Sequence, residues 1–342
     1  MRGTFVLVVA AGVAAAVGWS MVRQAAEDPS PAATESLVAA DPAPESQVVP
    51  PPLPSVPQRS EEPATEDPVT SAKAILEADP ASLRDAACRS AALRVAETLL
   101  QNAESAGTRD GVAARILARR LYASVYACDA STRVERDLAY ERSRALFVTL
   151  VKGNGAPAEL VMRHRVDAGQ SVWALAKGPW RQAGATVAPG FVLWINDVVD
   201  ARRLRVGQTL KVPLEPLTVV VRKRAFEISV LLGGAPVERF SVAVGADAKT
   251  PVGVFQAKDC LKNPDWYMNG RRIAFGTQGH IIGTRWIGLT GAPEAEGIGI
   301  HGTNDDTSIG TAASLGCIRM KNAEIERIFE WIGPGTRVEI RD

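Results

Sequence analysis

A cysteine and a histidine near the C-terminus have the types and the spacing that acyl-transfer chemistry requires. Cys317 directly follows Gly316 and precedes Arg319 by two residues, and His301 lies sixteen residues upstream with glycines close on both sides. A thiol nucleophile needs an imidazole within hydrogen-bond reach, and the imidazole needs a group that orients it. A neighbouring imidazolium or arginine lowers the pKa of a thiol from about 8.5. The pattern predicts Cys317 as a nucleophile and His301 as its base, provided that the loop between them folds back.

The other histidines and cysteines carry weaker signals. The chain has three histidines and four cysteines. His164 opens a separate motif, and His280 lies outside any matched motif, so we expect His280 to be a structural or cleft-rim residue. Cys260 lies in a polar stretch, and we expect it to be structural. No two cysteines form a CxxC pair, so no zinc site is expected, and no metal or organic cofactor is implied.

Five short motifs occur in order in the last third of the chain. They read Thr250-Pro251-Val252-Gly253-Val254-Phe255, Lys262-Asn263-Pro264-Asp265-Trp266, Ile282-Gly283-Thr284-Arg285-Trp286, His301-Gly302-Thr303 and Ser314-Leu315-Gly316-Cys317-Ile318-Arg319-Met320. Together they resemble the L,D-transpeptidase family, also called the YkuD domain. The resemblance covers residues 217–342 and implies a mainly-β catalytic domain.

The resemblance implies a role for each motif residue. The implied catalytic residues are Cys317, His301, Gly302 through its backbone, Ser314, Gly316 and Arg319. The carbonyl of Gly302 would orient the imidazole, and backbone N–H groups of residues 315–317 would form an oxyanion hole. Arg319 would shape the site or bind a substrate carboxylate. Many relatives carry histidine where this chain has Leu315, so His301 is expected to act alone.

The resemblance also implies a reaction. The family attacks the amide between an L-centred diamino acid and D-alanine in a peptidoglycan stem peptide. The cysteine forms a thioester, D-alanine leaves, and an amine from a second stem or a protein resolves the thioester. The expected function is therefore L,D-transpeptidation. Two alternatives stay open: an L,D-carboxypeptidase that uses water as the acceptor, and a non-catalytic peptidoglycan-binding envelope protein.

A second group of motifs occupies residues 162–214. It begins His164-Arg165-Val166-Asp167-Ala168-Gly169-Gln170-Ser171-Val172-Trp173, continues with Leu193-Trp194-Ile195-Asn196, and closes with Leu204-Arg205-Val206-Gly207-Gln208-Thr209-Leu210-Lys211-Val212-Pro213. This pattern resembles the LysM module, a strand–helix–helix–strand fold that binds N-acetylglucosamine-containing glycan strands. The resemblance implies Gly169, Ser171, Val172 and Asn196 as glycan-binding residues, between the loop 167–172 and the loop after Ile195. A spacer of the same shape without glycan affinity is the alternative.

Upstream of this module, residues 69–155 show apolar positions at helical spacing and have no chemical motif. A break at residues 105–108 predicts a helical hairpin within a bundle of three or four helices, acting as a spacer or a partner-docking unit. Cys88 and Cys128 lie twenty residues on either side of Thr108. Antiparallel helices with equal rise bring such positions to equal height, so a disulfide between them is predicted.

The N-terminal segments predict export. Residues 1–26 contain a charge-free run from Thr4 to Val22, close to the length of about 20 residues that spans a bilayer. A single-pass anchor on the extracytoplasmic side of the membrane is expected, with signal-peptide cleavage and secretion as the alternative. Residues 27–68 hold eleven prolines, nine acidic residues and one basic residue, which predicts an extended linker.

Composition limits the remaining possibilities. The net charge of the 342-residue chain is +1, so no nucleic-acid partner is expected. The predicted architecture is multidomain: a membrane helix, a disordered linker, a small α-helical bundle, a LysM-like module and a mainly-β catalytic domain. Peptidoglycan stem peptides, glycan strands and the membrane are the expected partners.

Overall fold

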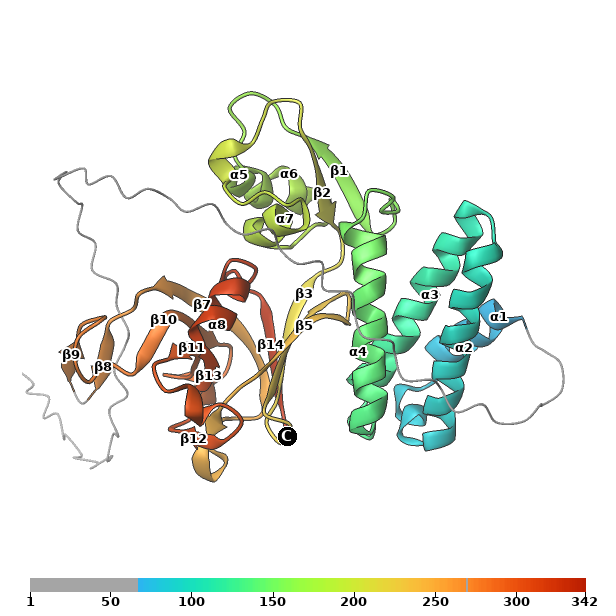
Figure 1. The fold of residues 1–342 in the computed structure, drawn as a ribbon. Helices are drawn as coiled ribbons and strands as arrows, with labels where there is room; N and C mark the ends of the chain where they lie inside the picture. The colour runs from blue at the N-terminus through green and yellow to red at the C-terminus, as the bar shows by residue number, and fades with distance from the viewer. Residues whose placement is uncertain (1–66, 269) are drawn as a thin grey trace, which may run out of the picture.

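The computed structural model describes residues 67–268 and 270–342. It shows a helical part, a small module of two strands and short helices, and a domain built on one large sheet (Figure 1). The predicted membrane segment, and the predicted linker up to residue 66, lie outside the described residues. Within the described part, no helix combines the length and the apolar character needed to span a bilayer.

The helical part contains the predicted hairpin. Its elements are α1 (Pro68–Glu77), η1 (Pro80–Arg84), α2 (Ala86–Ser105), α3 (Thr108–Ala127), α4 (Arg133–Phe147) and the π-helical turn η2 (Val148–Lys152). The break between α2 and α3 falls where the sequence predicts it. Thr132 begins α4 with a capping box, because its hydroxyl accepts from the amide of Glu135 while the Glu135 carboxylate accepts from the amide of Thr132.

The predicted disulfide between Cys88 and Cys128 is wrong. Both are free thiols, and Cys88 is exposed in the first turn of α2. Cys128 lies just beyond the end of α3, and its sulfur points at the carbonyl oxygen of Leu83, 3.2 Å away. The equal-height argument fixes only the axial position of a residue, and here the two side chains take different directions.

The large sheet supplies the frame of the C-terminal domain. Its strands are β3 (Leu217–Arg222), β4 (Glu227–Leu232), β5 (Ala235–Ser241), β7 (Gly253–Lys262), β10 (Ile282–Thr290), β11 (Gly299–Thr303), β13 (Ile318–Lys321) and β14 (Arg337–Arg341), in the order β13-β11-β10-β7-β14-β3-β4-β5. Short pairs form beside it from β6 (Val244–Gly245) with β12 (Ala312–Ser314), and from β8 (Trp266–Met268) with β9 (Arg271–Ile273). The mainly-β expectation is confirmed for this domain.

Two pairings in the sheet are parallel, β11 with β13 and β14 with β3. Parallel neighbours need a crossover connection rather than a tight hairpin. Between β11 and β13 the chain makes its crossover through β12, and α8 (Asn322–Phe329) follows β13 at once and packs on β10, β11 and β13. The starts of the two strands therefore lie side by side, Ile300 beside Ile318, although loop residues separate them in the sequence.

The small module has the predicted strand–helix–helix–strand order, with extra turns. Antiparallel strands β1 (Val161–Arg165) and β2 (Thr209–Pro213) enclose α5 (Val172–Lys177), α6 (Pro179–Gln182), α7 (Pro189–Ile195) and η3 (Ala201–Arg203). The Lys177-Gly178-Pro179 segment separates α5 from α6, because Pro179 begins a new helix. The identification of this module as LysM stays a prediction.

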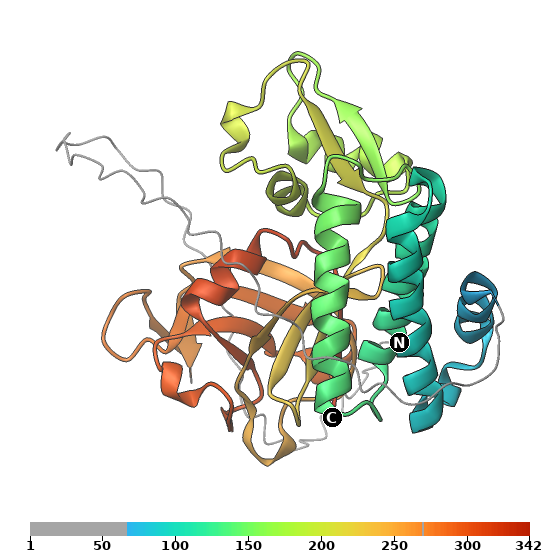
Figure 2. The ribbon, with the colours of Figure 1, turned by 45° about the vertical axis from the view of Figure 1, so that its right-hand side comes forward.

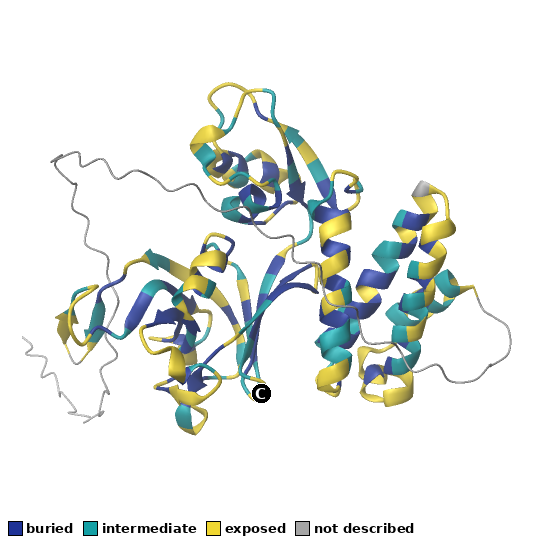
Figure 3. Cartoon of the chain, in the orientation of Figure 1, coloured by how far each residue is buried: buried dark blue, intermediate teal, exposed yellow. Residues whose placement is uncertain are grey.

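The helical part packs directly on the sheet. Figure 2 shows α4 running beside α3 and next to β5, and both helices contact β5. In Figure 3, buried positions run along α3 and along the strands nearest to α4. The side chain of Arg119 on α3 is almost completely buried and donates to the Glu215 carboxylate at 2.6 Å and to the carbonyl of Leu232 at 2.5 Å. The helices are thus part of the same packed body as the sheet.

Replacing Arg119 should destabilise the whole body. We expect Arg119→Ala to lower the free energy of unfolding by about 3 kcal/mol, because it leaves Glu215 and a buried carbonyl without their partner. Urea denaturation measures the change. Arg133→Ala is the matched control, since the Arg133 side chain is 91% exposed and should change the value by less than about 0.5 kcal/mol. Equal effects from the two changes would contradict this account of the interface.

Candidate active site

Parallel pairing of β11 and β13 brings the segments that carry the predicted nucleophile and base side by side. His301 is paired with Arg319 in the register of the two strands. Side chains in a strand alternate between faces, so Arg319 and His301 lie on one face of the sheet. Cys317 stands two residues before Arg319, directly ahead of β13, and the same alternation places its side chain on that face. The loop between the two segments therefore returns the chain to the strand that carries His301.

The imidazole of His301 is buried and held in one orientation. Its Nδ1 lies 2.6 Å from the carbonyl oxygen of Gly302, and the residue is 4% exposed. A carbonyl oxygen only accepts, so Nδ1 carries the proton and Nε2 is left as the acceptor. The indole of Trp286, across the strand pair, stacks on the imidazole with centroids 5.6 Å apart and an interplanar angle of 22°. The ring is thus fixed by one hydrogen bond and one aromatic face.

Asn322 secures the backbone that supports His301. Its side-chain amide donates to the carbonyl of Thr303 at 2.9 Å, and its oxygen accepts from the amide of Thr284 at 3.0 Å. A Cβ atom at Gly302 would lie 2.1 Å from this oxygen, so the glycine is required for close approach. The sequence does not signal Asn322, and it places Trp286 in a motif without revealing that its ring stacks on His301.

The thiol of Cys317 is enclosed by the segment that leads into β11. Its Sγ lies 3.5 Å from the carbonyl oxygen of Gly297. A Cβ atom at Gly299 would lie 2.6 Å from the Trp286 ring, so this position also needs glycine. Cys317 as a residue keeps partial exposure, which leaves a path for a substrate.

Hydrogen bonds from Ser314 hold the loop before Cys317. The hydroxyl of Ser314 donates to the carbonyl of Cys317 at 2.6 Å and accepts from the amide of Gly316 at 3.1 Å. Gly316 has a φ of +138°, a conformation that side-chain-bearing residues rarely adopt. Since the Gly316 amide is already engaged, the amides of Leu315 and Cys317 are the better candidates for an oxyanion hole.

Thr250 connects this loop to the rest of the domain. The residue is fully buried, and its hydroxyl donates to the carbonyl of Gly316 and accepts from the amide of Gly245, both at 2.7 Å. Next to it, Asp247 and Ala248 both have positive φ, at 51° and 57°. Such conformations cost energy and persist only where the surroundings impose them. The sequence places Thr250 in a motif but does not reveal this role.

Two cationic or basic groups complete the surroundings of the site. Among the described residues, the Arg319 guanidinium forms no ion pair within 4 Å, and its charge acts on the Asp305 carboxylate. His280 is buried, its Nε2 lies 2.8 Å from the carbonyl oxygen of Pro264, and its own carbonyl accepts from Asn304. His280 is therefore held by two backbone contacts, and its role as a structural or cleft-rim residue stays a prediction.

Comparison with known proteins decides the family. A model of the L,D-transpeptidase catalytic domain matches residues 216–340. YqjB from Bacillus subtilis, a member of that family by name, is 41% identical over 127 residues, which cover 36% of this chain and 70% of YqjB. YkuD from the same organism is 30% identical over 144 residues, which cover 40% of this chain and 77% of YkuD. The chain belongs to the L,D-transpeptidase family.

Solved L,D-transpeptidases also match, over part of the chain. One from Mycobacterium smegmatis is 12% identical with a TM-score of 0.31, and the match covers 41% of this chain and 76% of that one. One from Enterococcus faecium is 19% identical with a TM-score of 0.29, and the match covers 40% of this chain and 54% of that one. The chain thus spans about half the length of the Enterococcus faecium structure.

In this L,D-transpeptidase, burial sets the protonation state of the candidate pair. Burial lowers the pKa of His301 to about 4, opposed by the Gly302 carbonyl and assisted by the charge of Arg319. Burial raises the pKa of Cys317 to about 11, opposed by the amide of Gly299 and by Arg319. Both groups are therefore uncharged near pH 7, because desolvation penalises the ionised forms. The expectation of a thiolate stabilised by an imidazolium is wrong for the resting site.

The residues predicted to bind glycan lie in the small module, away from Cys317. Ser171 caps α5 by accepting from the amide of Ala174 at 3.2 Å, and Gly169 has a φ of +79° in the turn before it. Val172 is fully buried. Asn196 donates to the carbonyls of Val192 and Lys211 and accepts from the Lys211 amide, so it joins α7 to β2.

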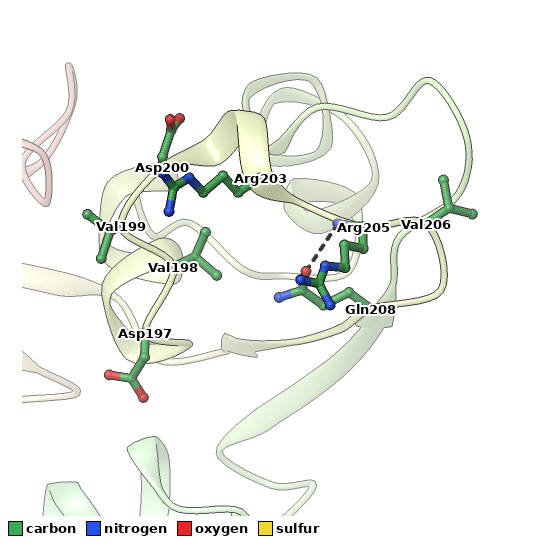
Figure 4. Close-up of a pocket in the computed structure, with 8 residues that line it drawn as sticks. All are labelled: Asp197, Val198, Val199, Asp200, Arg203, Arg205, Val206 and Gln208. Atoms are coloured by element: carbon green, nitrogen blue, oxygen red, sulfur yellow. Dashed lines mark hydrogen bonds between the residues drawn. The ribbon is translucent and has the colours of Figure 1, made fainter.

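A hollow of about 540 Å³ lies in the same module. It is formed within the loop between α7 and β2 and is lined by Asp197, Val198, Val199, Asp200, Arg203, Arg205, Val206 and Gln208 (Figure 4). The side chains of Val199 and Val206 are strongly exposed, at 101% and 70%. The loop 167–172 contributes no lining residue, so the hollow differs from the expected groove between the two loops.

The raised pKa of Cys317 predicts slow, steeply pH-dependent alkylation. We expect its reaction with iodoacetamide to rise about tenfold per pH unit between about pH 7 and 9.5 without levelling off, because only the thiolate reacts. Peptide mapping by mass spectrometry measures the rate at Cys317 alone. A short cysteine peptide is the reference, and its rate should level off above its pKa of about 8.5. A plateau near neutral pH at Cys317 would show that the thiol is already ionised.

Removing the Thr250 hydroxyl should disturb the nucleophile loop. We expect Thr250→Val to slow acylation of Cys317 by a carbapenem about tenfold, since two buried backbone groups lose a partner and 1.4 kcal/mol corresponds to a factor of ten. Intact-protein mass spectrometry follows the adduct. Thr277→Val removes an exposed hydroxyl that donates to the Ala274 carbonyl and should leave the rate unchanged. An unchanged rate in Thr250→Val would rule out a positioning role.

Proposed function

We propose that this family member is a peptidoglycan L,D-transpeptidase that uses Cys317 as the nucleophile and His301 as the base. The observation that carries the proposal is the register of the β11–β13 pair, which sets His301 beside Arg319, two residues after Cys317. The Nδ1–H of His301 donates to the carbonyl of Gly302, so Nε2 is the basic atom. The family match supports the same reaction class.

The neutral resting pair determines how acylation proceeds. His301 Nε2 takes the thiol proton as Sγ attacks the carbonyl carbon between the diamino acid and D-alanine, so charge separates only in the transition state. The oxyanion faces the amides of Leu315 and Cys317. The imidazolium then protonates the departing amine of D-alanine, and a thioester remains. An acceptor amine attacks the thioester and restores the thiol.

Arg319 is the proposed contact for a substrate carboxylate. Arg319 pairs in register with His301, and among the described residues its guanidinium forms no ion pair within 4 Å, although its charge also acts on the Asp305 carboxylate. A stem tetrapeptide ends in the free carboxylate of D-alanine, directly next to the bond that breaks. A charge-assisted hydrogen bond at that position would orient the scissile amide towards Sγ.

Substitution of the pair tests the assignment. Cys317→Ala should abolish thioester formation with a tetrapeptide donor. His301→Ala should slow it by roughly 10²- to 10⁴-fold, because the general base is lost. His280→Ala is the control and should keep most of the activity. A carbapenem should add to Cys317 and not to Cys88, Cys128 or Cys260; an adduct elsewhere, or full activity in Cys317→Ala, would refute the mechanism. Product masses then identify water or an amine as the acceptor.

A glycan-binding role for the small module is the accompanying proposal. The observation that favours it is the hollow between α7 and β2, where exposed valines adjoin arginine and glutamine side chains. Apolar faces beside hydrogen-bonding groups suit a sugar ring, which has apolar and polar sides. The module would hold the enzyme on glycan strands.

Binding to insoluble peptidoglycan tests the hollow. We expect Val199→Ser combined with Val206→Ser to reduce retention of the protein in a pull-down about tenfold, through the loss of apolar contact. Val134→Ser is the matched control, because Val134 is 75% exposed on α4 and remote from the hollow. Equal retention of all three proteins would mean that the hollow does not bind glycan.

A further inference from the structure

The junction between the small module and the catalytic domain is an aromatic cluster. The rings of Trp194 and Trp331 lie 4.3 Å apart, and Phe191 packs against both at 5.5 Å. Phe147, at the end of α4, stacks on Trp194 at 5.7 Å with an interplanar angle of 8°. Trp331 and Phe147 are almost completely buried. Rings from all three parts of the described chain thus meet at one point.

The backbones at this junction are in contact as well. A Cβ atom at Gly190 would lie 2.2 Å from the carbonyl oxygen of Glu330, so no larger residue fits there without separating the two parts. The Cβ atom of Ala188 lies 3.7 Å from the Cβ position built at Gly333. The start of α7 is therefore seated directly on the segment that follows α8.

Polar contacts and short connections restrain the module further. Lys152 forms an ion pair with Asp197 at 2.8 Å and lies over the Trp194 ring at 5.1 Å. Only residues 214–216 join β2 to β3, and Glu215 among them is bound by the buried Arg119. A module attached in this way does not swing as a domain on a flexible linker would.

We propose that the module and the catalytic domain engage a single glycan strand as one rigid unit, so that polymeric peptidoglycan is the preferred substrate. The inference rests on the proposed function and adds a substrate class to it. A flexible tether raises only the local concentration of stem peptides. A fixed junction instead selects stems at one distance from the bound sugar, because the hollow between α7 and β2 keeps a constant separation from Cys317.

A reversible lock across the junction tests this directly. Ala188→Cys together with Gly333→Cys should form a disulfide, since 3.7 Å matches the usual Cβ–Cβ separation of about 3.8 Å. We expect the oxidised and the reduced protein to cross-link isolated sacculi at the same rate. Failure of the disulfide to form, or loss of activity on sacculi in the oxidised form alone, would overturn the proposal, because either result requires a module that moves.

A larger side chain at the junction provides the opposite test, because it should separate the module from the catalytic domain. Gly190→Leu should reduce turnover of sacculi at least about tenfold while turnover of soluble tetrapeptide fragments stays the same. Added to the double-cysteine protein, it should slow disulfide formation, which reports separation independently of activity. Gly155→Leu is the control, because a Cβ atom at Gly155 meets nothing within 4 Å.

The outcomes separate the two proposals. Unchanged turnover of sacculi in Gly190→Leu, or unchanged disulfide formation, would overturn the rigid-unit proposal. Absence of activity on soluble fragments in the unmodified protein would instead refute the proposed function itself.

Discussion

The parallel pairing of β11 with β13 is the constraint on which the active site depends. It sets His301 opposite Arg319 and leaves Cys317 at the entrance to β13, on the same face. Because the two strands are parallel, the residues between them must leave the sheet at the end of β11 and re-enter it at the opposite end, beside the start of β11. That return forms the loop whose conformation Ser314, Gly316 and Thr250 then hold. The loop geometry is therefore a consequence of strand order as much as of the motif.

The burial that fixes the orientation of His301 and encloses Cys317 also keeps both groups uncharged. Trp286 covers the imidazole, and the segment before β11 surrounds the thiol, so both groups lose hydration. Burial destabilises the ionised form of each group. The pKa of the His301 base is therefore lowered and the pKa of the Cys317 nucleophile is raised, so the neutral pair is favoured. A site of this kind resists modification by adventitious electrophiles, and it reacts when a substrate supplies both the carbonyl and the geometry for proton transfer.

Much of this arrangement can be read from the sequence, for reasons that also mark its limit. Residues in local motifs are predictable, as with the α2–α3 break and the Gly302 position beside His301. Contributions from distant elements are not: Trp286, Asn322 and the Thr250 hydroxyl act across strands, and nothing in their own segments signals it. The disulfide prediction failed for a related reason, since spacing along a helix determines height but not the direction of a side chain.

The helical part has no chemical motif, yet it explains why the other two parts keep a fixed relation. α3 and α4 pack on β5, and buried Arg119 binds both Glu215, in the connection to β3, and the end of β4. The end of α4 supplies Phe147 to the aromatic junction with Trp194. One helical element therefore contacts the sheet along its length and the small module at its end. A spacer between two independent domains would need neither contact, so the helices are better understood as the frame that sets the module against the sheet.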